Sequence, residues 1–157
     1  MNISENKFEL VVYQIKHNSN VSNSWLDIIS QELLKHANFP KTLIEGDRNL
    51  FQATTKLIVT YALATCSYES LSKYIHNRNL VAQSIKQLIT GELKFNNRNS
   101  LSHQLANSLS ALKKYSTNED TLLRKVEVFV FYISMEFSLE VFEEIINRLF
   151  LELGVCK

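Results

Sequence analysis

The sequence predicts an all-α fold, a helical bundle of five or six helices that ends in a long C-terminal helix. The 157 residues include only three glycines and one proline, so turns are few and regular elements are long. Apolar residues make up 45% of the chain, and they recur mainly at the three- and four-residue spacing of a helix face. A chain of this length can bury a core without disulfides, so we expect residues 1–157 to form a single domain.

The first helix is predicted to begin after Ser4, whose hydroxyl can cap it, and to end near His17. Its apolar stripe comprises Phe8, Val11, Val12 and Ile15. Residues 18–23 lack an apolar period and are rich in Asn and Ser, which favours a loop. A second helix then begins at Ser24 and stops before Pro40.

The middle of the chain is predicted to hold the central core helix, which runs from Leu50 to Ile75 and could kink near Cys66 and Ser67. A shorter helix follows from Leu80 to Thr90. Gly91 closes this helix in the C′ position, where a glycine accepts left-handed backbone.

The last two predicted helices follow a polar stretch, residues 92–99. One begins at Leu101 and repeats leucine at near-heptad spacing. The other is the long final helix, which Thr117 caps and which extends from Leu122 almost to the end of the chain. Its aromatic residues exceed the needs of one core face and could supply a homodimer interface: Phe129, Phe131, Tyr132, Phe137, Phe142 and Phe150.

Charge is distributed unevenly along the chain, although the net charge is only +1. Residues 73–125 hold nine Lys and Arg against three Asp and Glu, an excess of six positive charges. Such a block is typical of a surface that binds a phosphate backbone, and solvated helix faces are the alternative. Within it we expect Arg78, Lys94, Lys113 and Lys114 to bind RNA.

Several classes of site are not indicated. Cys66 and Cys156 lie 90 positions apart, with no Cys-x-x-Cys or Cys-His cluster, which argues against a zinc site or a disulfide framework. We therefore expect no metal and no cofactor, and a reducing cytoplasm as the location. The longest apolar run, Val128 to Ile133, is far shorter than the roughly 20 residues that span a bilayer, so we expect no membrane association.

The segment Arg98-Asn99-Ser100-Leu101-Ser102-His103 contains the side chains best suited to binding and catalysis. An arginine can bind a phosphate through two parallel hydrogen bonds, and a histidine exchanges protons near neutral pH. Five positions correspond to about 140° around an ideal helix, so Arg98 and His103 converge only if Arg98 approaches from outside the helix. The alternative is that Arg98 and Asn99 satisfy the loop and cap the helix while His103 is a surface residue.

This segment resembles the signature of the HEPN family, in which an Arg and a polar residue precede a His at the start of a helix. The resemblance implies a metal-independent endoribonuclease, often a toxin or antiviral effector, that acts on RNA as a homodimer. It implies Arg98 as the phosphate-binding and transition-state-stabilising residue, His103 as the general acid/base and Asn99 as an orienting group. Many members have Gly directly after the His, and one toxin subgroup has Tyr one position later, where this chain has Gln104 and Leu105.

The alternative function is a non-catalytic helical interaction or scaffold protein that binds a protein partner, such as an antitoxin, or RNA. A degenerate HEPN scaffold lies between these two functions. A helical adaptor with a peptide groove would make no use of His103.

Overall fold

The computed structural model describes residues 3–36, 47–95 and 98–153. These residues form eight helices and no strand, which confirms the all-α fold class. The helices are α1 (Ile3–His17), α2 (Ser19–His36), α4 (Arg48–Thr65), α5 (Tyr68–His76), α6 (Arg78–Thr90), α7 (Ser100–Lys113), α8 (Glu119–Glu136) and α9 (Leu139–Leu153). Pro40 and Cys156 lie outside the described residues.

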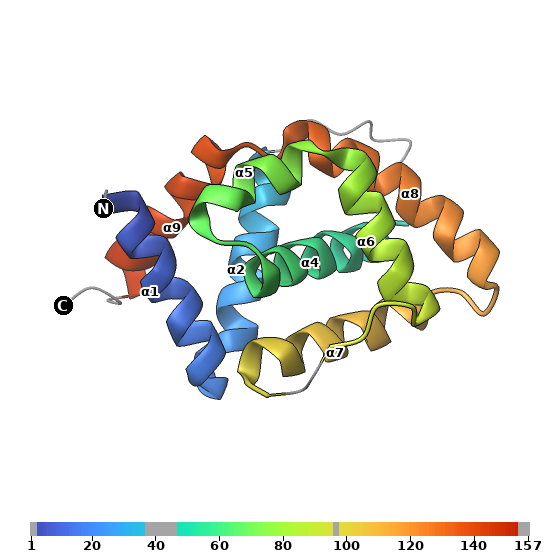
Figure 1. The fold of residues 1–157 in the computed structure, drawn as a ribbon, viewed down its shortest axis with the longest axis horizontal. Helices are drawn as coiled ribbons and strands as arrows, with labels where there is room; N and C mark the ends of the chain where they lie inside the picture. Colours follow the sequence, from blue (N-terminus) through green and yellow to red (C-terminus); the bar gives the residue numbers. More distant parts are fainter. Residues whose placement is uncertain (1–2, 37–46, 96–97, 154–157) are drawn as a thin grey trace.

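Helix α4 is the centre of the fold, and α2, α6 and α7 surround it (Figure 1). Ten of its 18 residues are buried, and these are seven apolar residues and three threonines. The buried threonines in this helix do not leave hydroxyls without partners. Thr54 and Thr55, for example, each donate to the carbonyl oxygen four residues earlier, at 2.8 and 3.0 Å.

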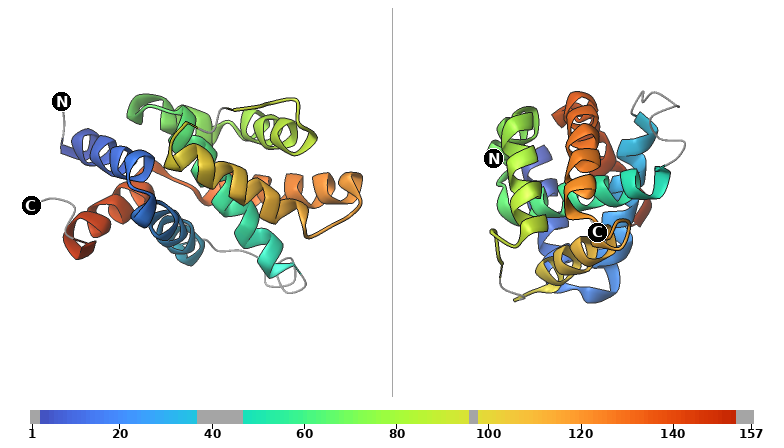
Figure 2. Two further views of the ribbon diagram at one scale, coloured as in Figure 1. Left: turned by 90° about the horizontal axis from the view of Figure 1, so that it is seen from below. Right: turned by 90° about the vertical axis from the view of Figure 1, so that its right-hand side faces the viewer.

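Helices α1 and α9 pack against each other at one end of the molecule (Figure 2, left). The Lys7 ammonium donates to the Asn147 side-chain oxygen at 3.0 Å, and the rings of Phe8 and Phe142 are 5.9 Å apart. At the opposite end, α6 and α7 finish and α8 begins (Figure 1). Helix α7 therefore extends from the end where α1 and α9 pack toward the end where α8 begins.

Two predicted boundaries are confirmed. The first helix ends at His17, and Gly91 adopts left-handed backbone, with φ of 83°, directly after α6. The second boundary depends on local chemistry, because left-handed backbone costs little free energy only for glycine, which has no side chain.

The predicted loop at residues 18–23 is wrong, because α2 already begins at Ser19. The Asn18 side chain accepts a hydrogen bond from the Asn20 backbone amide at 3.1 Å, so Asn18 performs the capping expected of Ser24. Ser22 is fully buried and Val21 is half-buried. Packing of this turn against the core outweighs its low helix propensity.

Two predicted long helices are each divided, which gives eight described helices where five or six were expected. The central helix ends at Thr65, and Ser67 and Ser70 form a reciprocal capping box that starts α5. The long C-terminal helix ends at Glu136, and the Ser138 hydroxyl then accepts from the Val141 amide at 3.1 Å.

The residue that caps α8 also differs from the prediction. Asn118, and not Thr117, accepts a hydrogen bond from the Thr121 amide at 3.1 Å. Within the ranges given above, every helix is too short or too polar to cross a membrane.

Candidate functional site

The predicted site lies at the start of α7. Asn99 has extended backbone and is the N-cap, and its side-chain oxygen accepts from the Ser102 amide at 2.9 Å and from the Ser102 hydroxyl at 3.2 Å. The helix depends on this residue because its first amides have no carbonyl partner within the helix. The geometry of Asn99 is that of a capping residue.

Arg98 precedes the helix and is exposed, as convergence with His103 requires. His103 lies in the second turn and is also exposed, and its amide donates to the Asn99 carbonyl oxygen at 3.0 Å. Leu101 and Leu105, each 1% exposed, fix the opposite face of α7 in the core. Both candidate side chains therefore lie on the solvent side of the helix, and neither lines the two large pockets described below.

The four predicted RNA-binding residues do not gather around this segment. Lys113 and Lys114 are exposed at the other end of α7, about 15 Å from His103 at 1.5 Å per residue. Lys94 is exposed in the loop after α6. Arg78 begins α6 and lies 4.5 Å from the centre of the Phe131 ring, a cation–π contact.

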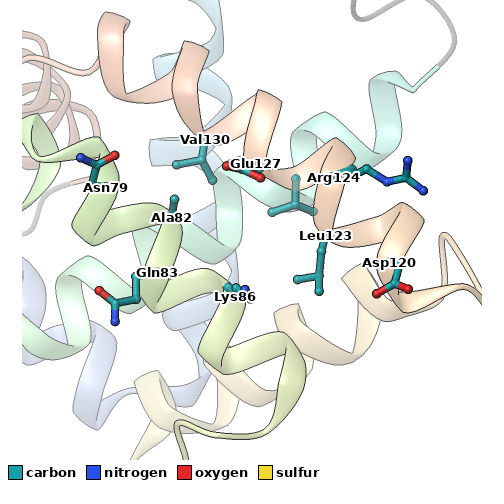
Figure 3. A pocket seen from close by; sticks show the side chains of 10 residues that line it. Asn79, Ala82, Gln83, Lys86, Asp120, Leu123, Arg124, Glu127 and Val130 are labelled. Atoms are coloured by element: carbon teal, nitrogen blue, oxygen red, sulfur yellow. The ribbon is translucent and has the colours of Figure 1, made fainter.

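One pocket, of about 720 Å³, is lined by residues of α6 and α8. Leu123 and Val130 of α8 face Ala82 of α6 across it, while Arg124 points to the far side of α8 (Figure 3). The lining also contains Asp120 and Glu127, so both signs of charge are present. This pocket has no charge preference that would select an anion.

An exposed apolar stripe runs along α8. Val128, Phe131 and Met135 are 43%, 41% and 61% exposed and occupy positions i, i+3 and i+7 of the helix. The other aromatic residues that we expected at an interface are mostly in the core, since Phe129, Phe137, Phe142 and Phe150 are buried. The surface available for association is therefore smaller than the sequence suggested.

A second pocket, of about 530 Å³, lies among α2, α4 and α7, and sequence reasoning missed it. It begins at Gln104, the residue after His103, and extends along α7 to Tyr115. Its lining includes six side-chain carboxamides: Asn23, Gln31, Asn49, Gln52, Gln104 and Asn107. The signal in the sequence was a recurrence of polar residues three, four or seven positions apart on each of the three helices.

A group of partly and fully buried polar side chains lies where α4, α5 and α6 meet. The rings of Tyr61 and Tyr74 are 6.0 Å apart. Burial raises the pKa of both phenols, and burial likewise raises the pKa of the Cys66 thiol. These groups are neutral near pH 7, and a raised thiol pKa disfavours the reactive thiolate.

The described residues contain no group of three or more His, Cys, Asp or Glu side chains that could hold a metal ion. No family model, curated protein or solved structure matches this chain.

Proposed function

We propose that the protein binds single-stranded RNA along α7, with Lys113 and Lys114 as phosphate contacts. The observation that carries this proposal is the state of the basic block. All nine of its cations are exposed: Lys73, Arg78, Lys86, Lys94, Arg98, Lys113, Lys114, Arg124 and Lys125. Of these, only Lys125 forms an ion pair with another described residue, at 3.3 Å from the Asp47 carboxylate.

Exposed cations that are not held in ion pairs are what a polyanion can neutralise. Glu143 accepts from the Tyr68 hydroxyl. Asp120 and Glu127 line a pocket together with Lys86 and Arg124, which leaves Lys113 and Lys114 outside that surface of mixed charge. Each lysine that contacts a phosphate releases condensed counterions, which makes the affinity fall as salt rises. Lys113 and Lys114 are adjacent to Tyr115, whose ring is 48% exposed and can stack on an unpaired base.

The test is fluorescence anisotropy of a labelled single-stranded RNA over a series of salt concentrations. Replacement of both lysines, Lys113→Gln with Lys114→Gln, should reduce the slope of log affinity against log salt by about 1.4, from about 0.7 per phosphate contact. The matched control removes two charges elsewhere, with Lys16→Gln and Lys35→Gln. If the slope falls equally in the two double variants, the effect is one of net charge alone. A slope of zero for the wild type would reject the proposal.

RNA cleavage is a second proposal, favoured by the exposure of both Arg98 and His103 beside the pocket that begins at Gln104. In this reaction the 2′-OH attacks the adjacent phosphorus, the bond to the 5′ oxygen breaks, and a 2′,3′-cyclic phosphate and a free 5′-OH result. His103 would move the proton and Arg98 would stabilise the charge on the phosphoryl oxygens. RNA cleavage by the wild type in the presence of EDTA, together with its loss in His103→Ala, would support this proposal. Undiminished cleavage by that variant would exclude the site.

Cleavage by one imidazole needs a second acid or base, which a homodimer could supply. A stable dimer buries about 800 Å² of each partner. Helix α8 is about 27 Å long at 1.5 Å per residue, and one face of a helix about 10 Å wide offers far less than that area. The homodimer thus remains a prediction, and light scattering of the wild type beside Met135→Glu measures whether α8 contributes to it.

A further inference from the structure

We propose that the amide-lined pocket among α2, α4 and α7 binds a nucleobase. This inference rests on the proposed RNA binding, because it names the part of the RNA that the protein recognises in addition to the phosphates. The pocket volume of about 530 Å³ is within the range of about 300–1,000 Å³ that is usual for small-molecule sites.

Three helices each contribute one polar face to the pocket. On α4 the face consists of Asn49, Gln52 and Lys56, and on α7 it includes Gln104 and Asn107. The opposite faces of these helices are buried in the core. The carboxamides are therefore held on rigid elements, which lowers the cost of ordering them around a ligand.

The lining carries no uncompensated charge. Asp27 and Lys56 are its charged residues, and the Lys56 ammonium lies 2.7 Å from the Asp27 carboxylate. The same ammonium donates to the Asn23 side-chain oxygen at 2.7 Å. A phosphate or a carboxylate would meet an ion pair that is already satisfied, whereas a neutral ligand would not disturb it.

Ser108 is the most buried polar residue on the α7 side of the pocket. This residue lines the pocket and is 6% exposed, and its hydroxyl oxygen is fully buried with no hydrogen-bond partner among the described residues. Ser30, on the α2 side, is equally buried, but its hydroxyl donates to the Leu26 carbonyl oxygen at 2.7 Å. Because the Ser108 oxygen is closed to water, a ligand could bond it only after the side chain turns toward the pocket, so the exposed carboxamides are the groups that would meet a ligand.

A nucleobase can match these groups with both its edge and its ring face. A carboxamide presents one acceptor and two donors, and Asn and Gln pair with base edges through two parallel hydrogen bonds. Tyr115 lines the same pocket and offers an exposed ring for stacking. Lys113 and Lys114 precede it directly and can hold the phosphates of the nucleotide, a feature that a peptide backbone would not need.

The first experiment compares two labelled strands of equal length and charge by anisotropy, an adenosine oligoribonucleotide and an abasic one that lacks all bases. The wild-type protein should bind the strand with bases more tightly. Asn107→Ala, at an exposed helix position, should weaken that binding by about tenfold and leave the abasic strand unaffected. Gln83→Ala, which removes an exposed carboxamide at the other pocket, is the matched control and should change neither affinity.

The second experiment follows the side-chain amide NMR signals of Gln52, Gln104 and Asn107 during titration with AMP and with UMP. Shifts with the mononucleotides would support a base site that free nucleotides can fill, and shifts with the strand alone would support a base presented by RNA. The inference would be overturned if the signals stayed unchanged with AMP, with UMP and with the strand. It would also be overturned if a neutral peptide displaced the signals and the nucleotides did not. Equal binding of the abasic strand would also overturn it, while salt-dependent binding through Lys113 and Lys114 would still stand.

Discussion

The substitution Asn99→Ala separates a capping role of this residue from a chemical role. In the structure the Asn99 side-chain oxygen accepts two hydrogen bonds, from the amide and the hydroxyl of Ser102. Alanine removes both, and it leaves the first turn of α7 with an amide that only water can satisfy.

The expected loss in the free energy of unfolding follows from this capping geometry. Replacement of an N-cap Asn by Ala costs about 1 kcal/mol, within a range of about 0.5–2 kcal/mol. The Ser102 hydroxyl is half-buried and can turn to water, so it adds little to this figure. For a chain of 157 residues, 1 kcal/mol corresponds to a fall in Tm of about 2–4 °C. Asn99→Ser should lose only a fraction of this, because a serine hydroxyl also caps helices.

The measurement is urea unfolding followed by circular dichroism. Asn107→Ala is the control, since Asn107 is exposed in the same helix and makes no hydrogen bond with a described residue. The urea midpoint of this variant should equal that of the wild type or lie slightly above it, because alanine has a higher helix propensity than asparagine. Wild-type stability in Asn99→Ala, or an equal loss in Asn99→Ser, would refute the capping argument.

Three other substitutions test the fold by the same unfolding measurement. Gly91→Ala should cost about 1–2 kcal/mol from backbone strain alone, because φ is 83° and an added Cβ would meet no atom within 4 Å; no loss would contradict this. Phe129→Ala should cost about 3–5 kcal/mol, since the ring is 2% exposed and contacts Phe51 edge-on; a loss below 1 kcal/mol would show that the site collapses around the gap. Burial raises the pKa of Tyr74, so the folded state keeps this proton at a pH where the unfolded state, with a pKa of 10.0, releases it. Stability should therefore fall as the pH rises above about 10, and Tyr74→Phe should lose less between pH 9 and 11 than the wild type.

Local chemistry in the sequence was sufficient for several boundaries. A glycine after a run of helix formers predicted the end of α6, and Arg98 was expected outside the helix that contains His103, as the structure has it. These features depend on a few neighbouring residues, so no knowledge of the tertiary fold is needed to predict them.

Other boundaries depend on contacts between distant segments. Ser22 lies in a polar run that favours a loop, yet the fold buries it completely and makes that run helical. The helical period continues through Phe137, which is buried just after α8, and α9 then packs against α1 and α2. Periodicity alone cannot show such a break, because the apolar positions on both sides keep the same spacing.

The amide-lined pocket was missed for a related reason. The polar faces of α2, α4 and α7 each resemble a solvated helix face, and only the fold brings them together around Ser108. The carboxamides of Asn49 and Asn107 are 58 positions apart in the chain, so no motif search with a short window would join them.

The pairing of α1 with α9 also has a consequence for folding. The hydrogen bond between Lys7 and Asn147 joins residues that are 140 positions apart. Contacts of such long range close late, because the intervening chain must first lose its freedom. On the ribosome, α2 can cover part of the apolar stripe of α1 soon after α1 is made, whereas Phe142 of α9, which packs against Phe8, is synthesised much later. Until then the part of α1 that α9 covers is a surface on which chaperones can act.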